Sequence, residues 1–515
     1  MTARRGPRAR TDLAMRRRRW PRRVLIAVNV AVAMTLLSIG AAYGYVRYRL
    51  DSIRTLAAPH LSASTPGGTD SAGGLSPENI LLIGNETRAG LTSPAEIAAM
   101  GSPQKYSGSL SDVIMILHLD PAKRTASILS IPRDLFVPMP AGSPVGPYQK
   151  IDAALNDGSK GPDNLIQAIT ADLGIPINHF VELQFDGFER TVNAIGGMRL
   201  DFPEPVYDAY SGLNITTPGC QALNGAQALA LVRSRHLQYD PPGDYQPPAD
   251  WPSDPESDLS RIVRDHTFIK VLISTAESKG LSDPLTLNAF LGAVINQITI
   301  DPGLKSQLVA LATHYRHLDP AALPELTLPI TTVGGATGYY YAGADIGDVD
   351  FPVEPADQAV IAQWDASALP APSPPQVVAV NNLAGTPDLA GRTVAALTSA
   401  GLPATVGTNL PVPAPITETL IRYNANSLSQ ALAVKDHLNG ALMLDPDPSL
   451  PRGQVDIDAG STFSVDASPA AGPAASPASP ATPSRPPTVG PTPGGQQPSS
   501  ATDHLTPWDP IPCPA

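Results

Sequence analysis

Apolar residues between positions 75 and 355 recur in two alternating patterns. Short runs rich in Ile, Val, Leu and Phe are typical of strands in a covered sheet, and they alternate with stretches in which apolar residues recur every three or four positions, as on a helix. The predicted strands are Ile80–Ile83, Val113–Leu119, Ala126–Ser130, Phe180–Leu183 and Met198–Phe202. The predicted helices are Leu165–Leu173, Phe188–Ile195 and Ile262–Ser274. The alternation predicts a first folded domain of the α/β class over residues 75–355.

A shorter pattern of the same kind extends over residues 376–465. It begins with the strand-like Val377–Val380 and continues with the predicted helices Leu389–Ala400 and Leu428–Leu438. Strand, helix, strand, helix and strand within so short a stretch predict a compact α+β domain.

The chain after this second domain is dominated by Pro, Ser, Ala, Thr and Gly. Such a composition provides too few apolar side chains for a core, so we predict a disordered tail over residues 467–515. The segment Trp508–Cys513 is an exception, and it is a candidate for docking onto a folded part of the chain.

The longest apolar run, Val24–Val46, contains no charged side chain and would span roughly 34 Å as a helix, enough to cross a bilayer. Ten arginines and one acid, Asp12, precede it, so the positive-inside rule places residues 1–23 in the cytoplasm. We therefore predict a single-pass anchor in the cell membrane at residues 24–46, a linker at residues 47–74 and an extracytoplasmic remainder. A cleaved signal peptide is the alternative, although its apolar core would be shorter.

Charge is distributed unevenly along the chain. Residues 1–50 hold 12 of the 35 Lys and Arg residues but 1 of the 47 Asp and Glu residues. The remainder therefore carries 23 basic and 46 acidic side chains, a net charge of −23. This balance argues against a nucleic-acid-binding protein. It also makes local groups of arginine in the acidic part more informative.

The chain has two cysteines, Cys220 and Cys513, and both fall on the predicted outer side, where a disulfide persists. A bridge between them would tie the C-terminus to the first domain. Two free thiols and an intermolecular bridge are the alternatives.

Ionisable residues stand at the ends of two predicted strands. Asp112 directly precedes Val113–Leu119, and Arg133 and Asp134 follow Ala126–Ser130 closely. Strand ends are where α/β sheets bind ligands, so these residues are candidates for a site. The structural alternative is a helix-capping Asp112 and a simple Arg133–Asp134 ion pair.

Two further groups of charge lie in the same domain. In the segment Arg233–Ser234–Arg235, an extended backbone would point both guanidinium groups to one side, where an anion could lie between them. The alternative is pairing with Asp240 and Asp244. On the predicted helix that follows, one face carries Asp258, Arg261 and Asp265. The structural alternative for these three is a salt-bridge ladder on the protein surface.

Taken together, these motifs resemble the LytR-CpsA-Psr family. In chain order they are Asn79–Arg88, Ser111–Asp112, Ser130–Asp134, Lys150–Ala154, Arg233–Arg235 and Asp258–Arg264. The resemblance covers roughly Pro77 to Gly280, the core of the first domain. The segment from Val377 onward resembles the LytR C-terminal domain that is often appended in actinobacterial members.

The resemblance implies an α/β/α sandwich with a mixed central sheet and an apolar tunnel for a lipid. It implies a Mg²⁺-dependent phosphotransferase that ligates a glycopolymer, for example arabinogalactan, from a polyprenyl-pyrophosphate carrier onto peptidoglycan through a phosphodiester. A lipid-pyrophosphate-binding scaffold and a polyprenyl-pyrophosphate pyrophosphatase are the alternative functions.

The resemblance also assigns roles by motif position. The residues that would bind pyrophosphate are Arg133, Lys150, Arg233, Arg235 and Arg261, with Arg88 and Arg264 as second-rank candidates. Glu86 and Asp112 would bind Mg²⁺. Asp112, Arg133, Arg233 and Arg235 would be the catalytic residues. The sequence departs from the usual family residues at four positions: Glu86 stands in place of Asp, Leu110 in place of a frequent Arg, Asp152 in place of Asn and Asp265 in place of Gln.

Overall fold

The structure is a computed structural model. It describes residues 44–45, 47–63, 75–87, 109–240, 250–255, 258–278, 292, 295, 297–319, 322–335, 338–407, 418–461, 464–465 and 506–513. Residues up to Ile53 belong to one compact unit and residues from Arg54 onward to another. Among the described residues, no helix combines the length and the apolar character needed to cross a membrane. The predicted cytoplasmic segment and nearly all of the predicted anchor lie outside these residues.

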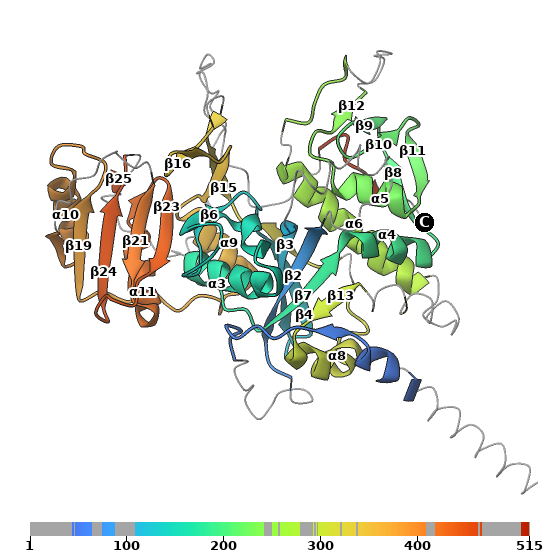
Figure 1. Cartoon of the computed structure of the whole chain (residues 1–515), viewed down its shortest axis with the longest axis horizontal. Coiled ribbons are helices and arrows are strands. Elements are labelled where there is room, and N and C mark those ends of the chain that lie inside the picture. Colours follow the sequence, from blue (N-terminus) through green and yellow to red (C-terminus); the bar gives the residue numbers. More distant parts are fainter. Residues whose placement is uncertain are drawn as a thin grey trace, which may run out of the picture. The chain divides into compact units, whose positions relative to one another are not determined.

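A mixed seven-stranded sheet forms the centre of the first domain (Figure 1). Its order is β1 (Arg54–Thr55), β13 (Ile298–Ile300), β7 (His179–Gln184), β2 (Glu78–Thr87), β3 (Ser109–Asp120), β4 (Thr125–Ser130) and β14 (Glu325–Thr327). β3 is antiparallel to both of its neighbours, β2 and β4. In contrast, β2 is parallel to β7 and β4 is parallel to β14. The predicted mixed sheet is therefore confirmed, and four of the predicted strands lie within it.

The apolar runs form these strands because their side chains are buried in one core with two helices. Leu81, Ile116 and Leu129 of the sheet pack in this core with Leu165 and Ile169 of α3 (Gly161–Leu173). α3 has proline in its first turn and ends at Gly174, whose φ of 72° is a left-handed conformation that glycine adopts easily.

The second helix of this core is α9 (Ala356–Trp364), which lies just beyond the predicted end of the first domain at residue 355. Val360, Ile361 and Trp364 are buried in the core, and the Trp364 indole donates to the Ser127 carbonyl at 3.2 Å. The predicted boundary is therefore too early. The helical periodicity of α9 is weak in the sequence, because the helix is short and follows a segment without regular secondary structure.

A second apolar core is formed by elements that come after β7 in the chain. It lies between helices on one side and three-stranded sheets on the other. Its elements are α4 (Phe185–Ala194), β8 (Met198–Phe202), β9 (Val206–Asp208), β10 (Leu213–Ile215), β11 (Gly219–Leu223), α5 (Gly225–Val232), β12 (Gln238–Tyr239) and α6 (Asp258–Ser278). Phe188 of α4 stacks on Phe268 of α6 with ring centroids 4.6 Å apart. These contacts fix α6, which carries several of the predicted site residues.

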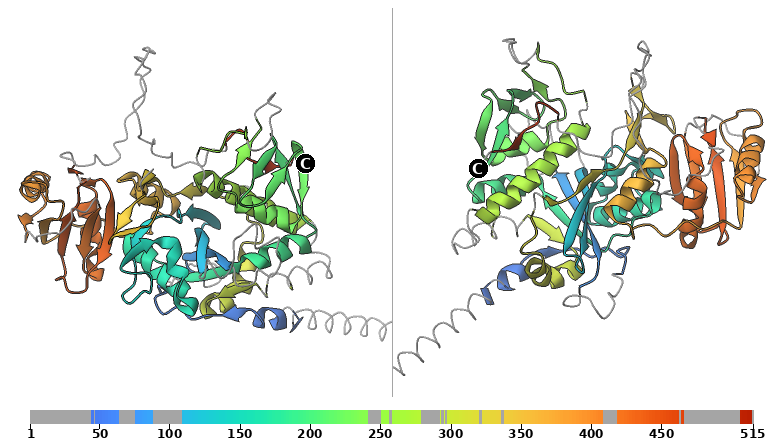
Figure 2. Two further views of the ribbon diagram at one scale, coloured as in Figure 1. Left: turned by 45° about the horizontal axis from the view of Figure 1, so that its top comes forward. Right: turned by 180° about the vertical axis from the view of Figure 1, so that it is seen from behind.

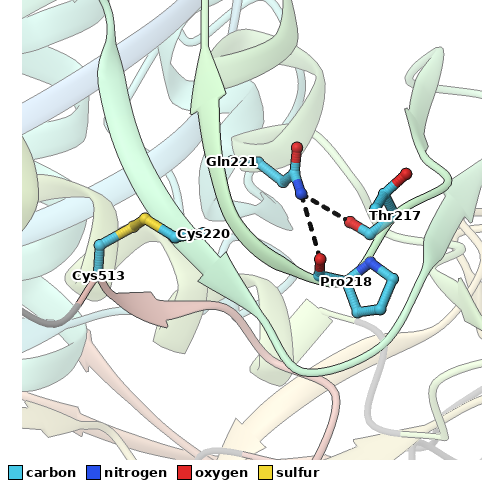
Figure 3. The surroundings of a disulfide bond; sticks show 5 residues. All are labelled: Thr217, Pro218, Cys220, Gln221 and Cys513. Atoms are coloured by element: carbon cyan, nitrogen blue, oxygen red, sulfur yellow. Dashed lines mark hydrogen bonds between the residues drawn. A yellow bond between two sulfur atoms is a disulfide. The ribbon is translucent and has the colours of Figure 1, made fainter.

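The C-terminal segment docks on this second core. β26 (Ile511–Pro512) pairs with β8, and the two strands lie together in both views of Figure 2. Cys513 forms a disulfide with Cys220, and their Cα atoms are 5.6 Å apart (Figure 3). Trp508 stacks on Tyr239 with ring centroids 3.9 Å apart. The structure thus contains the Cys220–Cys513 bridge, and the docking that we suggested for Trp508–Cys513 is confirmed.

Arg264 of α6 is enclosed by this docked segment. Its guanidinium group donates to Asp254 at 3.0 Å, to Asp509 at 3.1 Å and to the Ser234 carbonyl at 2.9 Å. The side chains of Arg264, Asp254 and Asp509 have no exposed surface (0%). Two buried carboxylates and one buried cation therefore hold α6, the loop before it and the C-terminal segment together.

Part of the predicted linker at residues 47–74 is also folded. β1 pairs in parallel with β13, the Leu56 amide donates to the Ile300 carbonyl at 2.9 Å, and the Ser62 amide donates to the Ile177 carbonyl at 2.7 Å. A linker is therefore the wrong prediction for residues 54–62. Residues 64–74 lie outside the described residues.

The second domain contains a five-stranded sheet and two helices. The sheet order is β20 (Ala404–Val406), β19 (Val377–Asn382), β24 (Gln454–Ala459), β21 (Thr419–Tyr423) and β23 (Leu442–Pro446). The helices are α10 (Leu389–Ser399) and α11 (Leu428–Lys435). The other strands and the other α-helix of the described residues are β5 (Phe136–Pro138), β6 (Tyr148–Lys150), α8 (Pro302–His314), β15 (Ile330–Val333), β16 (Tyr340–Tyr341), β17 (Ala344–Asp345), β18 (Val349–Pro352), β22 (Leu438–Asn439) and β25 (Ser464–Val465).

Buried polar contacts join the second domain to the first. Burial alone would lower the pKa of Lys435, but Asp357 and Glu354, at 2.8 and 2.5 Å, raise it above its usual value. The Tyr148 hydroxyl, on the β5–β6 hairpin, donates to Asp445 at 2.9 Å. A buried charged group is stable only when it is paired in this way, so these contacts specify one docking arrangement.

Asp172 of α3 lies at the same junction. One of its carboxylate oxygens accepts from the Leu444 amide at 3.2 Å, and no donor of the described residues reaches the other. Burial raises the pKa of Asp172 to about 7, partly offset by the nearby charge of Lys435. In the folded protein this carboxyl is therefore protonated in mildly acidic solution.

We expect Asp172→Asn to change how stability depends on pH. Because the folded-state pKa of Asp172 lies above that of an unfolded aspartate, the protonated carboxyl stabilises the fold below about pH 4, and this contribution is lost as the pH rises towards 7. From pH 5 to pH 8, the free energy of unfolding of the variant should therefore rise relative to that of wild type by about 3 kcal/mol. Thermal unfolding at a series of pH values measures this. Exposed Asp388→Asn is the control, and parallel profiles for Asp172→Asn and wild type would contradict the expectation.

Replacing Arg264 should destabilise the protein severely. Arg264→Ala leaves two buried carboxylates without their cation, a change that typically costs about 3 to 5 kcal/mol. The measurement is the thermal unfolding midpoint. Combining Arg264→Met with Asp254→Asn and Asp509→Asn should recover part of the loss, because the uncompensated charges are then removed. An unchanged midpoint in Arg264→Ala would show that the buried ion pairs are not structural.

Candidate functional site

Strand pairing brings the first two charged motifs to one edge of the central sheet. Gly84 and Asn85 of β2 pair with Val113 and Ser111 of β3, so Asp112 lies beside the end of β2. The Ile131 amide, just after β4, donates to the Ile114 carbonyl at 2.9 Å. Asp112 is thus a strand residue, and the alternative of a helix cap is wrong. A sharp register shift between Gly84 and Asn85 loosens the ladder at this point.

Asp112 joins three segments of the chain. Its carboxylate accepts a hydrogen bond from the Arg133 guanidinium group. Its backbone carbonyl accepts from Arg261 of α6 at 2.8 Å. Arg261 is buried at the edge of the sheet. Burying its charge costs free energy, which hydrogen-bond acceptors such as the Asp112 carbonyl must offset.

Asp134 is the second acidic centre. Its carboxylate accepts from Lys150 at 2.7 Å and from Arg235 at 3.2 Å, and it lies 3.5 Å from the Arg133 side chain. These side chains are partly exposed, whereas Arg261 is buried. Through Asp134, the loop after β4 therefore contacts both the β5–β6 hairpin and the segment after α5.

The four cations of this cluster outnumber its two paired acids. Arg133, Lys150, Arg235 and Arg261 contribute four positive charges against the charges of Asp112 and Asp134. An excess of positive charge among these described side chains favours a bound anion, and guanidinium forks match phosphate oxygens.

A third carboxyl, Asp152, lies close to these groups. Burial raises the pKa of Asp152 to about 7, and the nearby Arg133 opposes this while Asp134 and Asp112 add to it. The Asp152 amide donates to the Arg133 carbonyl at 3.2 Å. Near neutral pH the Asp152 carboxyl is only partly ionised. It therefore cancels less of the positive charge of the cluster than a fully ionised carboxylate would.

The segment Arg233–Ser234–Arg235 is a turn, not the extended strand that we predicted. α5 has a capping box at Asn224 and Gln227 and ends at Arg233, whose backbone is still helical. The Ser234 hydroxyl donates to the buried Asp208 at 2.7 Å, while the arginines on either side are half-buried. Burial of the serine therefore leaves the two arginine side chains nearer the surface. Arg235 pairs with Asp134 at 3.2 Å. Asp244, one of the two predicted partners of this segment, lies outside the described residues.

The remaining predicted residues divide into three groups. Arg261 and Asp265 are buried, so a surface salt-bridge ladder is excluded for them. Arg264 lies inside the framework between Asp254 and Asp509, where its side chain has no surface for the predicted pyrophosphate contact. Glu86 is backbone-paired with Leu110, but its side chain, that of Asp258 and the whole of Arg88 lie outside the described part. Within that part, no group of three or more His, Cys, Asp or Glu residues could hold a metal ion.

Two acids that support the site were missed from the sequence. Asp208 and Asp254 are buried and bind the Arg233–Arg235 turn and Arg264, respectively. Asp208 carried a weak signal, because it shares the buried phase of its strand with Val206. Asp254 lies in an irregular, proline-rich stretch and carried none.

Comparison with known families gives two matches along the chain. The LytR_cpsA_psr family matches residues 64–350. The domain described as LytR cell envelope-related transcriptional attenuator matches residues 376–463.

Named relatives come from several bacteria. "Probable cell wall biosynthesis protein LcpB" of Corynebacterium glutamicum is 32% identical over 226 residues, which are 44% of this chain and 48% of LcpB. "Cell wall biosynthesis protein LcpA" of the same organism is 27% identical over 51% of each chain. TagV of Bacillus subtilis, named as a polyisoprenyl-teichoic acid–peptidoglycan teichoic acid transferase, is 30% identical over 44% of this chain and 54% of TagV. The matches span about half the length of these relatives.

Solved structures with a similar chain include the LytR-Csp2A-Psr enzyme from Actinomyces oris, at 24% identity and a TM-score of 0.42 over 60% of this chain and 96% of that one. The crystal structure of B. subtilis TagV has 24% identity and a TM-score of 0.37 over 52% and 90%. The family match alone covers more than half of the 515 residues. The chain therefore belongs to the LytR-CpsA-Psr family.

Proposed function

We propose that this protein transfers a glycopolymer from a polyprenyl-pyrophosphate carrier to peptidoglycan, forming a phosphodiester. The observation that carries the proposal is the cluster of Arg133, Lys150, Arg235 and Arg261 around two acids. A pyrophosphate linked at both ends carries two negative charges, and guanidinium groups match its phosphate oxygens in charge and geometry. The relative TagV is named as a transferase from a polyisoprenyl-linked polymer to peptidoglycan.

The proposed reaction takes place on the outer face of the cell membrane. The predicted single-pass anchor at residues 24–46 would hold the protein there, and a carrier confined to the same membrane would reach the site at high effective concentration. Arabinogalactan is our first candidate for the glycan. The teichoic acid named for TagV is the alternative to compare in the same assay.

Phosphoryl transfer depends on positioning and charge neutralisation more than on covalent chemistry by the protein. A hydroxyl oxygen of the peptidoglycan sugar attacks the phosphorus next to the glycan and forms the new P–O bond. The bond from that phosphorus to the bridging oxygen breaks, and polyprenyl phosphate leaves. Arg133 and Arg235 would bind the phosphate oxygens as their charge shifts, and so would Arg233, which lies one residue from the anchored Ser234. Asp112 is our candidate to accept the hydroxyl proton.

Mg²⁺ is the proposed cofactor, with Asp112 and Glu86 as its ligands. Carboxylate oxygens are the ligands that Mg²⁺ prefers, and Asp112 of β3 lies beside β2, the strand that carries Glu86. When bound, the ion supplies further neutralisation of the pyrophosphate charge. Each step assigned above to the protein's own side chains stays the same.

Removing either arginine of the turn should impair transfer. We expect Arg233→Ala and Arg235→Ala each to lower kcat/KM about 10- to 100-fold, because each loses charged hydrogen bonds to the substrate. The assay uses the full chain in detergent, a polyprenyl-pyrophosphoryl glycan and peptidoglycan, and it follows both transfer and phosphate release. Exposed Arg392→Ala in the second domain is the matched control.

Normal transfer in both arginine variants would disprove the site assignment. Tight lipid binding without any product in wild type would instead indicate a binding scaffold. Phosphate release without transfer would indicate a pyrophosphatase.

Chelation should remove the activity reversibly. EDTA is expected to abolish transfer and Mg²⁺ to restore it, whereas Asp112→Asn should require a higher Mg²⁺ concentration. Binding is measured separately as the rise in the thermal unfolding midpoint that Mg²⁺ causes in the presence of inorganic pyrophosphate. A midpoint that does not respond to Mg²⁺, together with full transfer in EDTA, would exclude the proposed metal.

A further inference from the structure

An exposed pair of aromatic rings lies next to the arginine turn. The rings of Tyr210 and His236 have centroids 4.4 Å apart and an interplanar angle of 39°. Tyr210, between β9 and β10, is 71% exposed, and His236 is exposed directly after Arg235. A large ring held at the surface beside a cationic site, with one face against a partner, can bind the flat face of a ligand.

Asp208 fixes this pair with respect to the arginines. The carboxylate has no exposed surface (0%), and one of its oxygens accepts from the Tyr210 amide at 2.8 Å and the Ser211 amide at 3.3 Å. The other oxygen accepts from the Ser234 hydroxyl at 2.7 Å and the His236 amide at 3.0 Å. A single buried acid therefore ties the turn that carries Tyr210 to the turn that carries the arginines.

These contacts differ from those of an ordinary surface aromatic. The hydrogen bonds of Asp208 hold the backbone at Tyr210 and His236 and leave both ring systems at the surface. Buried polar groups that hold an amphipathic ring in place at the surface are typical of binding sites for polar ligands with an apolar face. A sugar ring has such a face, since its axial C–H groups are apolar while its hydroxyls are polar.

We propose that Tyr210 and His236 form a sugar-binding subsite beside the phosphate-binding arginines. The inference rests on the proposed function and deepens it, because it assigns the protein surface that holds a sugar of the reaction. The sugar stacks on the Tyr210 ring, and His236 supports that ring from its other side. The sugar belongs either to the glycan of the donor or to the peptidoglycan acceptor, and the experiment below separates the two sources.

The test compares ligands with and without a sugar on the full chain in detergent. The probes are geranyl pyrophosphate and geranyl-pyrophosphoryl N-acetylglucosamine, with peptidoglycan as acceptor. We expect Tyr210→Ala to raise the KM of the sugar-bearing donor about tenfold, or that of the acceptor, while the Kd of geranyl pyrophosphate stays unchanged. A higher donor KM assigns the subsite to the donor, and a higher acceptor KM assigns it to peptidoglycan.

Further variants separate stacking from folding. Tyr210→Trp keeps a flat ring and should stay within about threefold of wild type. Tyr340→Ala removes a tyrosine that is 64% exposed on the β16–β17 hairpin and should change none of the constants. The thermal midpoint of each variant shows that it is folded.

The failures of the two proposals are distinguishable. If wild type transfers the sugar and Tyr210→Ala has the same constants, the subsite is overturned and the proposed function stands. An equal weakening of geranyl pyrophosphate binding in Tyr210→Ala also overturns the subsite, because the ring then acts on the phosphate site. If wild type neither binds geranyl pyrophosphate nor transfers the sugar, both proposals fall.

Discussion

Cations gathered at one edge of a sheet repel one another, and the acids between them make the arrangement stable. Asp134 pairs with Lys150 and Arg235, and the carbonyl of Asp112 receives Arg261. Because these partners come from the β5–β6 hairpin, the turn after α5 and helix α6, distant parts of the chain depend on the same two residues. The acids do not cancel the cations completely, and the remaining positive charge is what an anionic substrate can compensate.

Buried polar contacts, more than regular secondary structure, hold the arginine turn in place. Ser234 is the central residue, since its hydroxyl donates to Asp208 and its carbonyl accepts from Arg264. A serine held on both sides in this way explains why Arg233 and Arg235 remain nearer the surface although the backbone is not extended. Arg264 in turn depends on Asp509, so the docked C-terminal segment contributes to the geometry of the site.

Apolar periodicity was enough to predict the central strands and the long helices, because their side chains are buried in regular phase. It could not predict the pairings that assemble the site. Arg264 and Asp509 are 245 positions apart, and nothing in either segment indicates the other. The two motifs at Asp112 and Arg133 were recognisable because strand order in an α/β sheet brings strand ends together. The conformation of the arginine turn depends on Asp208, which only the folded chain brings beside it.

The departures from the family pattern have a physical interpretation at Asp152. An aspartate in place of the usual asparagine adds a negative charge to the phosphate site if it is ionised. Burial raises the pKa of Asp152 to about 7, with Asp134 and Asp112 contributing, so near neutrality the residue is partly a neutral acid. A protonated carboxyl is neutral and offers an O–H donor and a carbonyl acceptor, much as the neutral asparagine side chain offers an NH₂ donor and a carbonyl acceptor. The substitution therefore preserves much of the positive excess on which anion binding depends.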